Sequence, residues 1–183
     1  MAYQLNYFEV IKALFLPVNI SFLLLAIGIP TIIIFTVLYK TNPMGNKRYQ
    51  WMIVVSVVLA PVAAMLFISQ NNVGAGWCLK DDKLQIKAWP VETTIDLTLT
   101  QVALVDSSSS WKPVLRTNGY GTSGLETGWF KLQNGKNAVV FYHLTPSKIL
   151  VLQSEGQYYL LAHPGVEELY RKIVKQEVSE IAQ

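Results

Sequence analysis

A glycine-rich stretch in the second half of the chain has the spacing of a known binding motif. It reads R-T-N-G-Y-G-T-S-G, so Gly119, Gly121 and Gly124 are spaced G-x-G-x-x-G. In a dinucleotide site this spacing joins a strand to a helix, because the pyrophosphate rests on the N–H groups of the helix N-terminus. Here the following residues, L-E-T-G-W-F-K-L, contain Gly128 and aromatic strand formers in place of a helix. A dinucleotide site is therefore excluded.

Two interpretations of this stretch remain open. Glycines permit positive φ and close backbone approach, so the run suits a wide loop or a bulged strand. Exposed N–H groups of the same loop, together with the guanidinium of Arg116, could instead form a small anion-binding nest. The candidate ligand or partner loop consists of Arg116, Asn118, Gly119, Gly121, Gly124 and Gly128.

Groups that commonly do catalysis or bind metals are few and scattered. His143 lies in an apolar run and His163 precedes Pro164, and the absence of patterned carboxylates beside them argues against a metal site. The serines at 107–110 lack the strand–turn–helix context of a nucleophile. The two aspartates at 81–82 suit a turn, and no pair of carboxylates is spaced for acid–base chemistry. We therefore expect no enzyme activity, no cofactor and no metal.

The single cysteine, Cys78, excludes an internal disulfide and a cysteine-based zinc site. It lies between Trp77 and Leu79 at the start of a strand-like run. This position favours a packed or membrane-proximal thiol over a reactive one.

Composition and the distribution of charge narrow the class of protein. Hydrophobic residues make up 51% of the 183 residues and charged residues 15%, which is typical of a membrane protein with a globular part. The net charge is +3, yet the chain from residue 70 onward contains nine Lys and two Arg against four Asp and seven Glu. The excess positive charge thus lies in the first part of the chain. A neutral second part is unsuited to nucleic acid or to purely electrostatic binding of anionic lipid.

Two long uncharged runs dominate the first part. No charged residue occurs between Lys12 and Lys40, or between Arg48 and Lys80. Each run can contain the roughly 20 residues that cross about 30 Å of hydrocarbon. The short loop between them is basic and has aromatic residues at its ends, as membrane-flanking loops do. We therefore predict a transmembrane hairpin over residues 17–69.

The hairpin divides the chain into parts. We expect residues 1–16 to be an N-terminal tail or an interfacial helix, residues 70–76 to be a linker, and residues 77–183 to be a folded domain.

The orientation of the hairpin follows from its flanking charges. Three basic residues in the short loop predict a cytoplasmic loop and a domain outside the cytoplasm. Lys80, Lys83 and Lys87, which follow the second span, favour the opposite orientation. The balance slightly favours an extracytoplasmic domain.

After the linker the periodicity changes to that of strands. Apolar and polar residues alternate, as in I-D-L-T-L-T at 95–100, which is typical of half-buried strands. Asn134-Gly135 and Glu155-Gly156 lie between adjacent runs, where hairpins need residues that tolerate positive φ. Beyond Pro164, apolar residues recur at helical spacing from Val166 to Ile173. The pattern predicts about seven strands and one closing helix, in a small barrel or strongly bent sheet.

Four segments of this domain carry a family resemblance. They are R-x-N-G-x-G-x-x-G-x-x-x-G-x-F at 116–130, N-G-K at 134–136, A-V-V-F-Y-H-L-T-P-S-K-I-L-V-L at 138–152 and S-E-G-Q-Y-Y-L-L-A-H-P-G-V-E-E-L at 154–169. Through them the chain resembles the bacterial pleckstrin-homology-like (PH-like) domain family, especially its membrane-anchored members. The resemblance implies a seven-stranded, two-sheet barrel capped by a C-terminal helix, with a binding or scaffolding role and no enzyme activity.

Eukaryotic PH domains often hold inositol phosphates through a basic cluster between their first strands. Here that region reads Lys80, Asp81, Asp82 and Lys83, whose charges cancel, so phosphoinositide binding is not carried over. The expected protein is a two-helix transmembrane hairpin plus a mainly-β PH-like barrel capped by a C-terminal α-helix, integral to a bacterial cytoplasmic (inner) membrane.

Three hypotheses for function follow. The first is a membrane-anchored binding or scaffolding module that contacts a protein or peptide near the bilayer, through a strand edge or the glycine loop. The second is a domain that binds a lipid or small ligand in an apolar pocket. The third is an accessory subunit of a membrane transporter or envelope enzyme, in which hairpin residues contact the partner; these are Gly28, Pro30, Ser56 and Ala60.

Overall fold

The computed structural model describes residues 1–15, single helical positions at 32, 36, 55, 59, 63, 66 and 67, and residues 69–181. The chain forms two compact units, which are described separately. One unit consists of Met1–Leu16 together with Asn72–Gln183, and the other of Pro17–Asn71. The predicted transmembrane hairpin, 17–69, lies outside the described residues except for those single positions. Within the part of the chain that the structure describes, no helix is both long enough and apolar enough to cross a bilayer.

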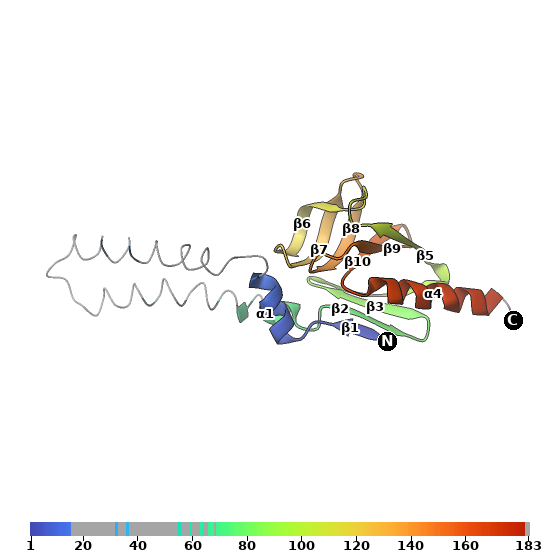
Figure 1. The fold of residues 1–183 in the computed structure, drawn as a ribbon, viewed down its shortest axis with the longest axis horizontal. Helices are drawn as coiled ribbons and strands as arrows, with labels where there is room; N and C mark the ends of the chain where they lie inside the picture. The colour runs from blue at the N-terminus through green and yellow to red at the C-terminus, as the bar shows by residue number, and fades with distance from the viewer. Residues whose placement is uncertain are drawn as a thin grey trace. The chain divides into compact units, whose positions relative to one another are not determined.

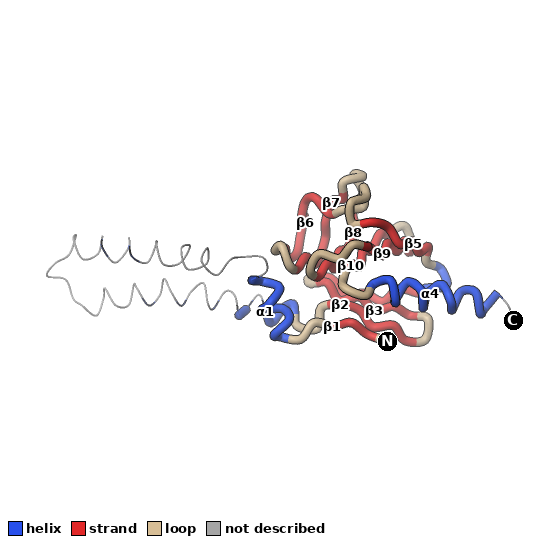
Figure 2. Tube along the Cα trace, in the orientation of Figure 1, coloured by secondary structure: helices blue, strands red, loops and turns tan. Residues whose placement is uncertain are grey.

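Two sheets make up the first unit (Figures 1 and 2). The smaller sheet is antiparallel throughout, in the order β1-β2-β3-β4. Its strands are β1 (Ala2–Gln4), β2 (Gly76–Lys80), β3 (Lys83–Ala88) and β4 (Val91–Asp96). The larger sheet has the order β5-β9-β10-β8-β7-β6. Its strands are β5 (Gln101–Asp106), β6 (Pro113–Gly121), β7 (Leu125–Leu132), β8 (Asn137–His143), β9 (Lys148–Ser154) and β10 (Gln157–Ala162).

Three helices complete the unit. The 3-10 turn η1 (Leu97–Leu99) connects the two sheets, and α1 (Tyr7–Phe15) follows β1. The closing helix α4 (Val166–Ile181) packs on β5 and β9 (Figure 1). Its first turn carries Glu167 and Glu168, which suit the positive end of the helix dipole.

Alternation of apolar and polar residues explains how each strand faces the core. In β3, Leu84 and Ile86 are fully buried while Lys83 and Gln85 point to solvent, because successive side chains alternate between the faces of a strand. The inward side chains of both sheets, together with α1 and α4, form one hydrophobic core. A second cluster around Phe130 covers the opposite face of the larger sheet. That sheet is therefore buried on both faces over much of its area.

The predicted hairpin turns are present. Asp81 and Asp82 have φ values of 49° and 59°, and they join β2 to β3. Glu155 and Gly156, at 50° and 78°, join β9 to β10. Two consecutive residues at positive φ give a turn whose twist matches that of the flanking strands.

Strand number and pairing differ from the expectation. About seven strands are expected, whereas the described residues form ten; the two sheets agree with the two-sheet barrel that the resemblance implies. The strand β10 inserts between β9 and β8, antiparallel to the first and parallel to the second. Of the two pairings of β10, local turn chemistry predicts the hairpin with β9. The parallel pairing with β8 depends on how the sheet closes over the core. The mainly-β PH-like character and the C-terminal helix agree with the prediction.

The N-terminal segment contains a helix, which was one of the two expected alternatives, and it also adds a strand to the folded domain. The strand β1 pairs with β2, placing Tyr3 opposite Trp77, and α1 buries Val10 and Ala13 completely. Residues 1–16 therefore belong to the folded domain. The predicted linker 70–76 is helical up to Asn72, and β2 begins at Gly76.

A buried aromatic cluster joins β1 to the rest of the domain. The Tyr3 ring stacks on His163 with centroids 3.9 Å apart, and its hydroxyl lies 2.7 Å from His143 Nδ1. Trp77 Nε1 donates to His163 Nε2 at 2.8 Å, while His163 Nδ1 lies 2.9 Å from the Pro164 carbonyl. The His163 ring therefore accepts at Nε2 and donates at Nδ1, which is the neutral imidazole. Burial lowers the pKa of both histidines below the ordinary value of 6.5.

We predict that the full chain in detergent loses thermal stability as the pH falls from about 7.5 to about 5. Because both histidines have a lower pKa in the folded than in the unfolded state, the unfolded state binds more protons in this window. The stabilisation that the two histidines contribute is fully present above the pKa that they have in the unfolded state. It is lost as the pH falls toward their lower pKa in the folded state. A His163→Gln variant should start less stable and lose less on acidification. Equal losses for both proteins would contradict the prediction.

Candidate binding site beside strand β6

The glycine run folds as a bulged pair of strands. Gly119 on β6 faces Gly128 on β7, with φ values of 128° and 108°. A methyl group on Gly119 would overlap the Thr127 carbonyl, and one on Gly128 would overlap the Asn118 carbonyl. Register shifts along β6 mark the bulges. These two glycines are thus needed for close backbone approach at positive φ.

Gly121 and Gly124 meet different neighbours. Gly124 lies under α1, where an added Cβ would overlap the backbone carbonyl of Ala13. At Gly121 a Cβ would lie 3.2 Å from Nη1 of the flexible Arg116 side chain and in ordinary contact with the Phe130 ring. The glycine loop therefore seats helix α1 on one side and borders Arg116 on the other.

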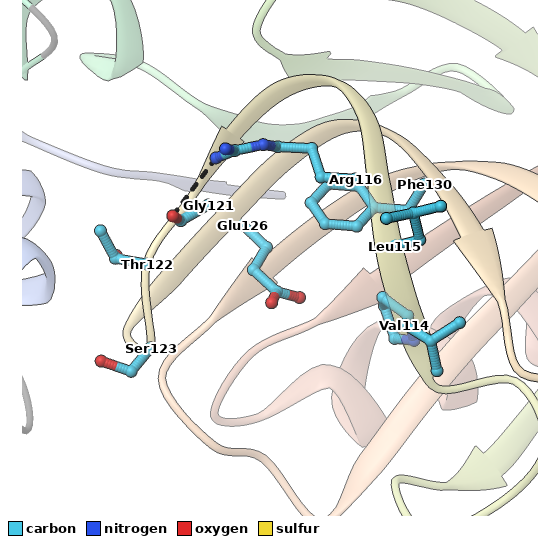
Figure 3. A pocket seen from close by; sticks show the side chains of 9 residues that line it. Val114, Leu115, Arg116, Gly121, Thr122, Ser123, Glu126 and Phe130 are labelled. Carbon is cyan, nitrogen blue, oxygen red and sulfur yellow. Dashed lines mark hydrogen bonds between the residues drawn. The ribbon is translucent and has the colours of Figure 1, made fainter.

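A surface pocket of about 470 Å³ lies between β6 and the start of β7 (Figure 3). Among the described strands β6 lies at the edge of its sheet, so one side of its main chain has no neighbour among them. Val114 and Leu115 at this edge are 59% and 58% exposed. The pocket is lined by Pro113, Val114, Leu115, Arg116, Gly121, Thr122, Ser123, Glu126 and Phe130.

Charged groups of both signs meet in the pocket. The Arg116 guanidinium donates from Nη1 to the Gly121 carbonyl at 3.3 Å (Figure 3). Glu126 lines the same pocket, and its carboxyl is directed away from this guanidinium in the view of Figure 3. Burial raises the pKa of the Glu126 carboxyl, while Lys112 and Arg116 act in the opposite direction. Within the part of the chain that the structure describes, Arg116 forms no ion pair with a carboxylate. Its guanidinium is available to a carboxylate or carbonyl from outside the chain.

The structure separates the predicted loop residues. Arg116 and Gly121 line the pocket. Asn118, Gly119 and Gly128 lie in the paired strands β6 and β7. Gly124 lies beneath α1. They do not converge on a single nest.

Sequence reasoning missed several pocket residues, notably Val114, Leu115 and Glu126. The sequence did contain a signal that one of Val114 and Leu115 is exposed, because two adjacent apolar residues in a strand cannot both face the core. In the structure both are exposed, because a bulge lies between Pro113 and Leu115.

The region corresponding to the phosphoinositide cluster holds a second pocket of about 400 Å³, and half-buried Cys78 lies in it. Its lining consists of Cys78, Lys80, Asp81, Lys83, Gln85 and Thr94, with charges of both signs. Within the described ranges no three His, Cys, Asp or Glu side chains are grouped to hold a metal.

Substitution of Gly124 should reveal its contact with α1. We expect Gly124→Ala to lower the free energy of unfolding by about 1–3 kcal/mol, the usual cost of overpacking, because backbone atoms cannot move aside as a side chain can. Gly121→Ala is the matched control, since neither glycine has a positive φ, and it should cost under about 0.5 kcal/mol. Denaturant titration of both variants measures the difference. Similar losses in the two variants would show that the α1 contact is unimportant.

Comparison with known proteins identifies the domain. The sequence matches the family described as Bacterial PH domain over residues 75–176, which is more than half of the chain. Comparisons with curated proteins and with solved structures find no match. The matched region begins just before β2 and extends into α4, so it contains both sheets apart from β1. The resemblance noted in the sequence is confirmed, and the chain belongs to the bacterial PH domain family.

Proposed function

We propose that this protein is a membrane-anchored bacterial PH domain that binds a segment of a partner protein beside strand β6. The observation that carries this proposal is the pocket at an exposed sheet edge, with apolar Val114 and Leu115 next to Arg116, whose guanidinium forms no ion pair with a carboxylate among the described residues. Such a surface suits a peptide that presents an apolar side chain and an acidic group. The proposed role is binding, without catalysis or a cofactor.

Two features support the membrane anchor. The uncharged runs between Lys12 and Lys40 and between Arg48 and Lys80 have the length and composition of spans. In the unit 17–71, the helical positions Val55, Leu59 and Phe67 expose their side chains, with exposed fractions of 44%, 58% and 66%. Apolar side chains exposed in this way are ones that lipid would cover.

The bulges of β6 limit how a partner binds. Pro113 has no N–H, and the register shifts twist the edge, both of which hinder continuous pairing with an added strand. Recognition is therefore assigned mainly to side chains in the pocket, with main-chain contacts over a short stretch only. This also protects the edge from indiscriminate pairing.

The other two hypotheses receive less support. A lipid site in the interior would need space between the sheets, but Trp77, Leu84 and Phe141 fill the core there. An accessory role through the hairpin would rest on Gly28, Pro30, Ser56 and Ala60, which lie outside the described residues.

A photo-crosslinking amino acid at Val114 should test the partner site in the native membrane. We expect one adduct of defined mass from Val114, and none from the same probe at Leu99, which is 74% exposed in η1. Arg116→Gln should lower the adduct yield about tenfold, because a hydrogen bond to a charged group contributes about 1.5–3 kcal/mol. Arg171→Gln, on exposed α4, serves as the control. An adduct from Leu99, or an unchanged yield in Arg116→Gln, would refute the site.

We further propose that the domain lies outside the cytoplasm, because the basic loop between the two runs favours the cytoplasmic side. In a Cys78→Ser background, a new cysteine at Gly135, in an open turn, reports the side of the membrane. A membrane-impermeant maleimide should label Gly135→Cys in cells whose inner membrane is intact. Labelling only after lysis would reverse the orientation and direct the search to cytoplasmic partners.

A further inference from the structure

One end of the PH domain carries both points at which the chain enters the unit 17–71. The first is the end of α1, which stops at Phe15, and the second is Asn72. The amide of Leu5 donates to the Ala75 carbonyl and the Leu5 carbonyl accepts from Gly74, so the two segments are held together. Thr127 Oγ1 also donates to Asn72 Oδ1 at 2.9 Å. This end is therefore a defined surface of the folded domain.

Helix α1 presents aromatic residues to the outside at this end. Its inner face buries Val10 and Ala13, whereas Phe8 is 76% exposed and Tyr7 41% exposed. At 100° per residue, Phe8 lies on the side of the helix opposite the core. The outer face of a helix in a water-soluble domain is normally polar. An outward Phe on a short helix therefore indicates a surface that something else covers.

The turn between β3 and β4 adds a third aromatic residue. Trp89 is 39% exposed, and its carbonyl lies against Gly128, next to the Thr127 that holds Asn72. Lys87, two residues earlier, donates from Nζ to the Val73 carbonyl at 3.1 Å. The β3–β4 turn is thus tied to the same end of the domain.

The charges on α1 suit an interface with lipid. Glu9 is engaged at the start of the helix, where its carboxylate accepts from the Asn6 amide at 2.8 Å and its amide donates to Asn6 Oδ1 at 2.9 Å. This capping box leaves Lys12 as the exposed charge of the helix. Aromatic side chains with a flanking lysine are the composition found at the level of lipid headgroups.

We propose that this end of the domain rests on the bilayer surface, with Phe8, Tyr7 and Trp89 in the headgroup region and Lys12 near the phosphates. The proposal rests on the membrane anchoring given under Proposed function, because the chain continues from α1 directly into the first uncharged run. The occupant is lipid, since a surface at the root of two membrane spans meets the bilayer before any partner.

The proposed contact with the bilayer determines where the β6 pocket lies. Thr122 and Ser123 line the β6 pocket, and the next residue, Gly124, lies against Ala13 of α1. The pocket is therefore held close to the bilayer surface. The partner segment it accepts is one that emerges close to the membrane.

Nitroxide accessibility in reconstituted vesicles tests the proposal on the full chain. In a Cys78→Ser background, a spin label is placed at Phe8→Cys or, as the exposed apolar control, at Leu99→Cys. The vesicles contain phosphatidylcholine and phosphatidylglycerol. We expect the ratio of collision with oxygen to collision with a water-soluble nickel chelate to be about tenfold higher at Phe8→Cys, which corresponds to about 1.4 kcal/mol of differential partition.

The outcomes separate this inference from the proposed function. If the chain floats with the vesicles and both positions give the same ratio, the bilayer contact is wrong while the anchor stands. Low accessibility of Phe8→Cys to both reagents would show a protein partner or a second copy on this surface, and would also overturn the proposal. If the chain does not float with the vesicles, the anchor itself fails.

Discussion

The contact on which the rest of the domain depends is the buried cluster of Tyr3, Trp77, His143 and His163. These side chains come from β1, β2, β8 and the segment before α4, so one cluster joins both sheets, the N-terminus and the closing helix. His163 hydrogen bonds in its neutral form, and ionisation of either histidine would bury a charge among aromatic rings. The neutral form of His163 therefore fits the contacts that close the domain.

This closure explains why residues far apart in sequence act as one unit. With β1 held against β2, helix α1 is fixed over the glycine loop, and the chain on both sides of residues 17–71 is fastened to the same domain. The glycines then have separate tasks. Gly119 and Gly128 allow the bulged pairing, Gly124 makes room for α1, and Gly121 leaves space for Arg116. The glycines of a motif that resembles a nucleotide-binding loop thus allow close packing, and the proposed binding surface lies beside them.

Much of the domain could be predicted from the sequence. Period-two alternation indicates strands such as β3, because burial of one face requires it. Residues that tolerate positive φ mark the tight turns at Glu155-Gly156, and helical spacing after Pro164 indicates α4. The family resemblance also came from residues 116–169, well inside the region that the family match covers. These features depend on neighbours within a few positions, so local chemistry suffices to show them.

The pairing of distant segments could not be predicted in this way. That β1 joins β2 across more than 70 residues, and that β10 lies parallel to β8, depends on which apolar faces the closed core can bury together. The same distinction between local preference and long-range packing applies to the candidate site. Arg116 stood out as a cation beside glycines, but its grouping with Val114, Leu115 and Glu126 arises only when β6 bulges and folds against β7. Residue types reveal what a segment prefers locally; long-range packing selects its partners.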